Sequence, residues 1–451
     1  MSTSSAGTSD PIAQRQAAIA SLEEQLGKTP RASRPYEHAA LAYRLGLAYS
    51  ESPVGPPADG LRKALACYEV AAGIFNPEMD PVQHARVLNA AGAAHRALGD
   101  RRRAVKLFEE AVGLFDGRDR DGEHAAALNN LGLTRTELGE PKDAIAAFDL
   151  AIDLFDSSTP DGARGRIAAL DNRGRAHSAL GTEEGLEAAL ADFEEARNDI
   201  DPEDAPYHNG LVAHSMGVTF SALAALRQPG EEERTRFLQE ATRSFTESLA
   251  VFTRTSFPFQ HALAKYNLGL AWYAMGGLTN LRRALASFED AVGILDTRVH
   301  ADAWRQAYAS LERVEKELEP LAPGLTRAEQ FAALVGDVPR EERESLVTGR
   351  LLRILAQPDA RRPMTELSLA IAKLGDEAAQ VIEAELDTIM QITIESQEIC
   401  LQAIFDAHTQ LTGEARQGAD RALDKAIGEA LGGPQRLFVR DFLYDRGWER
   451  P

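Results

Sequence analysis

Residues 257–273 read FPFQHALAKYNLGLAWY, and residues 279–295 read TNLRRALASFEDAVGIL. In the second stretch, Ala284 is followed four residues later by Phe288 and eleven residues later by Leu295. Offsets of four and eleven place side chains on one face of an α-helix, because both are close to whole numbers of turns. The two stretches therefore predict two consecutive helices, each with a face made of small and large residues.

The same pattern recurs along the chain with a period of about 40 residues, which is the length of one helix-pair repeat. Each first stretch has a glycine, and the six copies are Gly46, Gly92, Gly132, Gly174, Gly217 and Gly269. Each second stretch has an alanine four residues before a ring: Ala64, Ala104, Ala144, Ala189, Ala241 and Ala284. The interval between glycine and alanine varies from copy to copy, so we place the insertions between the two helices.

This pattern resembles the tetratricopeptide repeat, which has a Leu-Gly and an aromatic residue on its first helix and Ala-x3-Phe on its second. The resemblance covers residues 36–319, with a degenerate seventh first helix around Trp304 and Tyr308. The unit is longer than the usual one, and aspartate mostly stands where the terminal proline is expected: Asp116, Asp156 and Asp296. The long unit is similar to the kinesin-light-chain type, and more so to bacterial repeats found beside caspase-like CHAT protease domains. This chain has no such protease domain.

The resemblance implies an all-α solenoid, a right-handed superhelix whose concave surface is lined by the first helices. Glycine and alanine would let the two helices of a pair approach closely, while rings would fill the space between one pair and the next. Because no single pair can bury its apolar face, each pair is stabilised by its neighbours.

The chain is predicted to have three parts: a flexible N-terminus with one helix, the solenoid, and a small helical bundle, at residues 1–35, 36–319 and 325–451. The last boundary follows a Pro/Gly break at residues 318–324, LEPLAPG. We expect the C-terminal helices at residues 326–335, 341–356, 363–373, 376–411, 414–431 and 434–446. The helix at 376–411 is apolar on more than one face, so it is the spine of the bundle or part of a dimer interface. The aromatic tail packs on the bundle or, alternatively, docks a partner.

Composition and charge exclude several classes of function. The net charge of −20 disfavours binding to nucleic acid or to an anionic membrane. No apolar run reaches the roughly 18 residues of a membrane-spanning helix, and the polar N-terminus lacks the parts of a secretion signal. Cys67 and Cys400 form neither a disulfide framework nor a paired metal site. We therefore expect a cytoplasmic protein.

No motif predicts catalysis, a cofactor or a metal ion. The string Gly27-Lys28-Thr29 imitates a phosphate-binding loop, but Leu22 occupies the position of its first glycine. Four histidines, His38, His84, His124 and His261, each precede a repeat glycine by eight residues. Successive repeats hold them too far apart to share an ion, so we expect them to cap or pack at the start of each first helix. A helix-turn-helix drawn through residues 365–386 would present acidic side chains to phosphates.

The predicted concave groove is the remaining candidate site. By resemblance, the residues three before, one after and four after each glycine face it, and from these we select Tyr43, Asn89, Arg96, Asn129, Leu133, Asp171, Arg175, His214, Tyr266 and Tyr273. Asparagine can both donate to and accept from a peptide backbone, so Asn89 and Asn129 resemble a short asparagine ladder. Asp171, His214 and Tyr266 interrupt that ladder, and the columns contain no lysine for a carboxylate clamp. The alternative is a merely solvated inner face.

The sequence thus favours a non-catalytic adaptor that binds a partner protein or peptide in its groove. The C-terminal helices would supply a homodimer interface or a second contact. Two other hypotheses remain open: a sensor that responds to a small peptide, and an accessory subunit of an enzyme with a site in the C-terminal bundle.

Overall fold

The computed structural model describes residues 11–51, 57–117, 121–203, 205–321, 324–336 and 338–451. These residues form α-helices and one short 3₁₀ helix and include no strand, so the predicted all-α class is confirmed. No helix in this part of the chain combines the length and apolar character needed to cross a membrane. The chain divides into two compact units, Met1–Leu226 and Arg227–Pro451.

The described residues of the first unit form a leading helix, four helix pairs and a final single helix. Its helices are α1 (Pro11–Gly27), α2 (Pro35–Ser50), α3 (Pro57–Ala72), α4 (Pro81–Ala97), α5 (Arg101–Phe115), α6 (Asp121–Glu137), α7 (Pro141–Leu154), α8 (Pro160–Ser178), α9 (Glu183–Asp199) and α10 (Pro206–Ala225). The pairs α2–α3, α4–α5, α6–α7 and α8–α9 are those predicted from the repeats. The array is tetratricopeptide-like.

Close packing within each pair depends on the repeat glycine. A Cβ atom built on Gly132 would come within 2.7 Å of Phe148 Cε1, and one on Gly92 would come equally close to Phe108 Cε1. The same arrangement occurs at Gly46, Gly174 and Gly269. The alanine four residues before each of these rings is fully buried. The predicted close approach of the two helices is therefore confirmed.

Both rings of a second helix pack against the next pair. Phe108 clusters with Leu131 and Ala147 of the next pair, so the predicted packing between pairs is confirmed for this ring. It also lies against Gly92 of its own pair, because the glycine has no side chain and the ring occupies the volume that a side chain would have taken. The later ring, Phe115, packs with Ala127 of the next pair, as predicted.

The starts and ends of the first helices also follow the sequence pattern. Glycines with φ between 67° and 87° follow four first helices: Gly99, Gly139, Gly181 and Gly276. Ring nitrogens of the histidine column contact the backbone of the preceding segment: His84 Nδ1 lies 2.8 Å from the Phe75 carbonyl oxygen, and His261 Nδ1 lies 2.7 Å from that of Phe252. The predicted capping role is therefore confirmed for these two histidines.

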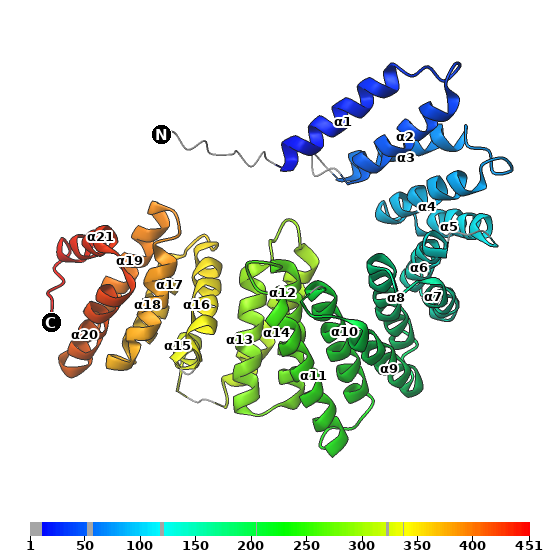
Figure 1. The fold of residues 1–451 in the computed structure, drawn as a ribbon. Coiled ribbons are helices and arrows are strands. Elements are labelled where there is room, and N and C mark those ends of the chain that lie inside the picture. Colours follow the sequence, from blue (N-terminus) through cyan, green and yellow to red (C-terminus); the bar gives the residue numbers. More distant parts are fainter. Residues whose placement is uncertain (1–10, 52–56, 118–120, 204, 322–323, 337) are drawn as a thin grey trace. The chain divides into compact units, whose positions relative to one another are not determined.

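First helices lie on one side of the array in Met1–Leu226. Successive first helices α4, α6, α8 and α10 contact one another, whereas each second helix packs mainly on the first helices before and after it (Figure 1). The first helices therefore form a continuous inner face in this unit, which is the surface the resemblance implied.

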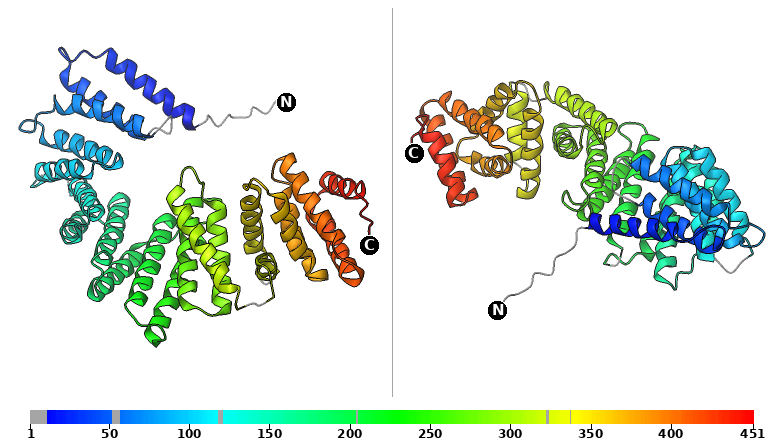
Figure 2. Two further views of the ribbon diagram at one scale, coloured as in Figure 1. Left: turned by 180° about the vertical axis from the view of Figure 1, so that it is seen from behind. Right: turned by 90° about the horizontal axis from the view of Figure 1, so that it is seen from above.

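The second unit begins with α11 (Glu232–Val251), the pair α12 (Pro258–Met275) and α13 (Leu278–Ile294), and α14 (Ala301–Leu318). The remaining helices are α15 (Arg327–Gly336), α16 (Arg340–Leu355), α17 (Arg361–Ala372), the 3₁₀ helix η1 (Gly375–Ala378), α18 (Ala379–Ile389), α19 (Ile394–Thr409), α20 (Gly413–Ala430) and α21 (Gly433–Tyr444). They form two rows, α16–α18–α20 and α15–α17–α19–α21, and Figure 2 shows this consecutive stacking in its yellow to red helices.

One hydrophobic core joins the repeat helices of this unit to the C-terminal helices, extending from Ala262 to Trp448. The backbones of α13 and α16 cross closely, because a Cβ atom on Gly293 would lie 2.5 Å from Gly349 Cα. The predicted division at residues 319–325 falls inside this unit and stays a prediction. Of the predicted N-terminal segment, residues 1–10 lie outside the described residues, and the rest contains α1.

A buried charge network, the Glu289 network, lies beside this crossing. It consists of Glu289 on α13, Glu315 on α14, and Arg350 and Arg353 on α16. Arg353 Nη2 lies 2.8 Å from Glu289 Oε1, and Arg350 also pairs with Glu289. Both arginines approach Glu315 Oε1, at 3.4 and 3.5 Å. The network ties the C-terminal helices to the repeat array.

The prediction of a single helix at residues 376–411 is wrong. The segment contains η1, α18 and α19, and Thr393 caps α19 by accepting a hydrogen bond from the Ser396 amide. The two apolar faces therefore belong to two helices: α18 packs on α16 and α20, and α19 packs on α17. The aromatic tail packs partly as predicted, since Trp448 is buried and its Nε1 donates to Asp420 at 3.1 Å, while Phe438 remains exposed.

Glu385 on α18 makes the stability of this unit dependent on pH. Its side chain is buried and accepts a hydrogen bond from Ser368 Oγ at 3.2 Å. Burial raises the pKa of Glu385 from 4.5 to about 7. Between these values the folded chain binds more protons than the unfolded chain, so stability falls as pH rises through this window. Glu385→Gln, which mimics the protonated acid, should raise the free energy of unfolding by about 3 kcal/mol at pH 8 and leave it nearly unchanged at pH 4.

Urea unfolding at the two pH values measures this difference. Glu366→Gln on α17 is the matched control, because Glu366 is exposed and pairs with Arg362 on the same helix. An equal gain in both variants at pH 8 would show that burial of Glu385 is not the cause.

Candidate functional site

Three residues of the predicted asparagine column form hydrogen bonds between successive first helices. Asn130 Nδ2 donates to Asn89 Oδ1 at 3.0 Å. Asn172 Nδ2 donates to Asn129 Oδ1 at 3.1 Å. Ser215 Oγ donates to Asp171 Oδ1 at 2.8 Å. These bonds, the inter-repeat ladder, run from α4 to α10 and hold neighbouring first helices in register.

The next column of the face carries the side chains that are most open to solvent. It consists of Leu47, Ala93, Leu133, Arg175 and Val218, one from each first helix, and we call it the central row. The first three side chains are half-buried, Arg175 is exposed and Val218 is 43% exposed. Arg175 Nη1 lies 3.5 Å from Asn172 Oδ1, next to the ladder. The central row is apolar except for this one cation.

The third column is half-buried and makes further contacts between first helices. Arg96 Nη1 donates to Glu137 at 3.3 Å, and Ser178 shares a 2.9 Å hydrogen bond with Thr219. The ring of Tyr43, from the asparagine column, packs against Tyr68 with 6.0 Å between centroids. These contacts fix the predicted groove side chains in place.

Burial shifts the pKa values of two predicted groove residues. Burial lowers the pKa of His214 to about 4, and nearby Arg175 acts in the same direction, so the imidazole is neutral at physiological pH. Burial raises the pKa of Asp171, against the effect of Arg175. Both side chains therefore contribute to packing between α8 and α10 more than to an exposed charged surface.

The predicted groove residues are divided between the two units. Tyr43, Asn89, Arg96, Asn129, Leu133, Asp171, Arg175 and His214 lie in Met1–Leu226, whereas Tyr266 and Tyr273 lie in Arg227–Pro451. In the second unit, Tyr266 packs on Phe288 with 5.8 Å between ring centroids, and Tyr273 donates a hydrogen bond to Glu317 on α14. The first unit is therefore the part of the chain that brings most of the predicted residues together.

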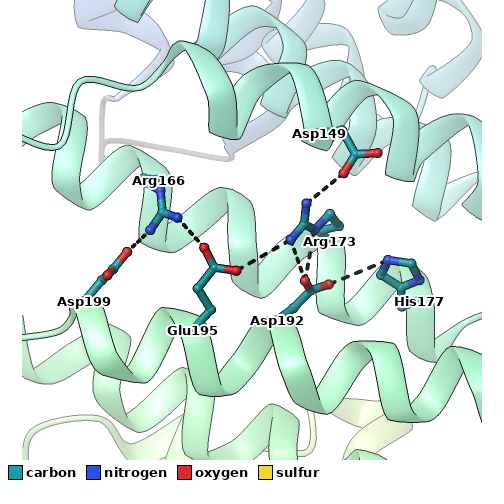
Figure 3. Close-up of polar contacts among 7 residues, drawn as sticks. All are labelled: Asp149, Arg166, Arg173, His177, Asp192, Glu195 and Asp199. Carbon is teal, nitrogen blue, oxygen red and sulfur yellow. Dashed lines mark hydrogen bonds and ion pairs between the residues drawn. The ribbon is translucent and has the colours of Figure 1, made fainter.

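A second polar cluster joins α7, α8 and α9 (Figure 3). Arg173 on α8 donates to Asp149 on α7 at 2.7 Å and to Asp192 on α9 at 2.6 Å. Figure 3 shows Glu195 between Arg173 and Arg166, and Arg166 also pairs with Asp199. The cluster links one helix pair to the next.

Asp192 is the buried centre of this cluster. Burial raises the pKa of its carboxyl group, while the adjacent Arg173 opposes that shift. Its second oxygen lies 3.7 Å from His177 Nε2. Each carboxylate of the cluster faces an arginine, and within the described residues no group of His, Cys, Asp or Glu side chains is arranged to hold a metal ion. We therefore interpret this cluster as a structural connection.

This cluster was not predicted from the sequence, although a signal was present. Arg173 directly precedes a repeat glycine, and the residue at that position is buried and apolar in four other copies: Leu45, Leu131, Met216 and Leu268. A charged residue in an otherwise apolar column needs a buried partner of opposite charge. Comparison of the columns could have pointed to Asp192.

Comparisons with known proteins give likeness in architecture. No protein-family model matches the chain, and no curated protein matches it. Solved structures that it resembles include the apo form of RapI, at 15% identity and a TM-score of 0.45 over 68% of this chain and 94% of that one. A monomeric mutant of IFIT1 with Gppp-AAAA has 13% identity and a TM-score of 0.42 over 82% of this chain and 78% of that one.

BtubC (BKLC) from P. vanneervenii has 14% identity and a TM-score of 0.34 over 69% of this chain and 93% of that one. These likenesses assign neither a partner nor an activity to this chain.

Proposed function

We propose that this chain is a non-catalytic adaptor that binds a partner protein or peptide along the first-helix face of Met1–Leu226. The inter-repeat ladder is the observation that carries the proposal. It fixes the side chains beside the central row before any partner arrives, and such preorganisation lowers the entropy lost on binding.

The chemistry of the face suits a polypeptide. The ladder bonds use the carbonyl oxygens of Asn89 and Asn129, whereas each carboxamide group also has two N–H donors that these bonds do not use. The central row beside them is apolar apart from Arg175 and is solvent-accessible at Val218. A partner would bury apolar side chains on this row while its backbone accepts hydrogen bonds from the amides. The C-terminal helices would supply dimerisation or a second contact, and the adaptor would act in the cytoplasm.

Pull-down of partners from the native host, with quantitative mass spectrometry, tests this function. The test variant combines Arg175→Gln, which removes the one cation of the central row, with Val218→Glu, which places a negative charge on it. The matched control is Leu150→Glu on the second helix α7, because Leu150 is 57% exposed but belongs to the opposite side of the array. The control should capture the same proteins as the wild type. The test variant should capture at least about tenfold less of each, which corresponds to a loss of about 1.4 kcal/mol of binding free energy.

Capture of the same set of proteins by both variants would show that the first-helix face does not bind them. Both variants should keep the helical circular dichroism of the wild type, because the substituted side chains of Arg175, Val218 and Leu150 are all exposed.

A further inference from the structure

A large pocket lies within Arg227–Pro451. Its volume is about 1320 Å³, and it is lined by residues of α11, α12, α13, α15, α16 and α18. This volume exceeds the range of about 300–1,000 Å³ that is usual for small-molecule sites. One wall belongs to the repeat helices and the other to the C-terminal helices, whose order can be followed in Figure 1.

The repeat wall is rich in basic side chains. Arg254, His261, Lys265 and Arg283 line it, and Asp290 is its one acidic residue among the described lining residues. Lys265 Nζ and His261 Nε2 each lie 3.2 Å from Asp290 Oδ2, and Arg254 Nη1 lies 3.9 Å from Asp290 Oδ1. One carboxylate thus faces three basic groups, while Arg283 adds a further positive charge.

Lys265 breaks the pattern of the repeats. It lies four residues before the repeat glycine, where the other copies have buried apolar residues: Ala42, Leu88, Leu128, Leu170 and Ala213. The lysine side chain is only 12% exposed. A buried charge is costly unless it is paired. Pairing with Asp290 offsets this cost. If the position were purely structural, however, two well-packed apolar side chains would give equal or greater stability than this buried ion pair. The substitution therefore points to a role in binding.

The pocket also has apolar surface on both walls and negative charge on the C-terminal wall. On the repeat wall, the apolar surface comes from Trp272, and the Arg283 guanidinium is 4.7 Å from its ring centroid. Leu334 and Val338 contribute apolar surface from the C-terminal side. The opposite wall also carries Glu344 and Asp387, and Glu344 pairs with Arg340 at 2.9 Å. Negative charge is therefore favoured only at the repeat wall.

We infer that this pocket binds an amphipathic organic anion. Its carboxylate or phosphate would lie between Lys265, Arg254 and Arg283, where charge-assisted hydrogen bonds are strongest. Its apolar body would pack on Trp272, whose ring is already held by Arg283. This site is separate from the proposed adaptor face, because it is lined only by residues of the second unit.

Fluorescence titration of the full chain with 8-anilinonaphthalene-1-sulfonate tests the inference, since this probe combines an anionic group with an aromatic body. Lys265→Met and Arg283→Gln should each weaken binding about tenfold, the effect of losing one charge-assisted contact. Arg243→Gln is the matched control: it removes a cation from α11, but Arg243 is 72% exposed and does not line the pocket. Arg283→Gln keeps the test valid if Lys265→Met does not fold, because Arg283 is exposed.

Competition separates the two kinds of anion. Phenyl phosphate displacing the probe better than benzoate would identify a phosphate ligand, and the reverse order would identify a carboxylate ligand. Benzylamine, which has a similar ring and a positive charge, should not displace it. Equal affinity in all three variants, no binding to the wild type, or displacement by benzylamine would overturn the inference. None of these results depends on Arg175 or Val218, so the adaptor proposal and this one can fail separately.

Discussion

Replacing Glu289 with leucine is expected to lower the free energy of unfolding of Arg227–Pro451 by about 3–5 kcal/mol. Glu289 is fully buried and pairs with both Arg350 and Arg353. Without it, the Arg350 and Arg353 guanidinium groups would share the carboxylate of Glu315, which also pairs with Arg327. The cost of leaving a buried charge uncompensated is much larger than the net gain from forming the pair. Urea unfolding followed by circular dichroism measures the loss.

A second variant tests whether charge is the cause. Glu289→Leu combined with Arg350→Met removes one charge of each sign, and Arg353 can still pair with Glu315, 3.5 Å away. Methionine also keeps apolar contact with Phe331, whose ring lies 4.3 Å from the Arg350 guanidinium. The double variant should therefore recover most of the lost stability. Glu366→Leu, at an exposed ion pair, should change it by less than about 0.5 kcal/mol. A loss at Glu289 no larger than at Glu366 would contradict the account.

The second large effect is expected at Gly132 and Phe148, where the two helices of a pair meet. Phe148→Ala should cost about 3–5 kcal/mol, because the ring is fully buried. Gly132→Ala should cost about 1–3 kcal/mol, because its new methyl group would lie 2.7 Å from a ring carbon. The double variant should cost less than the sum of the two, since the methyl group occupies part of the space that the ring vacates.

Gly113→Ala on α5 is the matched control for Gly132→Ala. Both glycines lie inside helices, but a Cβ atom on Gly113 would meet nothing within 4 Å. Alanine favours the helix by about 1 kcal/mol over glycine, so the control should raise the free energy of unfolding. Stabilisation by both substitutions would show that the glycine column is not needed for close packing.

The sequence was sufficient to predict the repeat array, because each repeat imposes the same spacing of glycine, alanine and rings. It was less informative for the C-terminal helices, which have no repeat to align. The interruption between α18 and α19 contains neither glycine nor proline, and only Thr393 with Ser396 three residues later marks the new helix start. Apolar periodicity continued across that interruption, so one long helix was predicted.

For the candidate site, the sequence indicated which columns lie on the first helices but not how their polar groups are used. Asn89 and Asn129 were expected to form hydrogen bonds with the backbone of a bound peptide. In the structure, their side-chain carbonyl oxygens accept hydrogen bonds from the next repeat. The donors Asn130 and Asn172 each lie two residues before a repeat glycine. They form a second polar column that was not used in the prediction. Lys265 and Arg173 were likewise visible as charges in apolar columns.

Photo-crosslinking in cells tests the central claim, that the first-helix face binds another protein. A photoreactive benzoylphenylalanine would replace Val218 on α10 in one variant and Leu150 on α7 in the other; the two side chains are 43% and 57% exposed. We expect a crosslinked protein adduct from position 218 and none from position 150. Adducts from position 150 alone, or from neither position, would contradict the central claim.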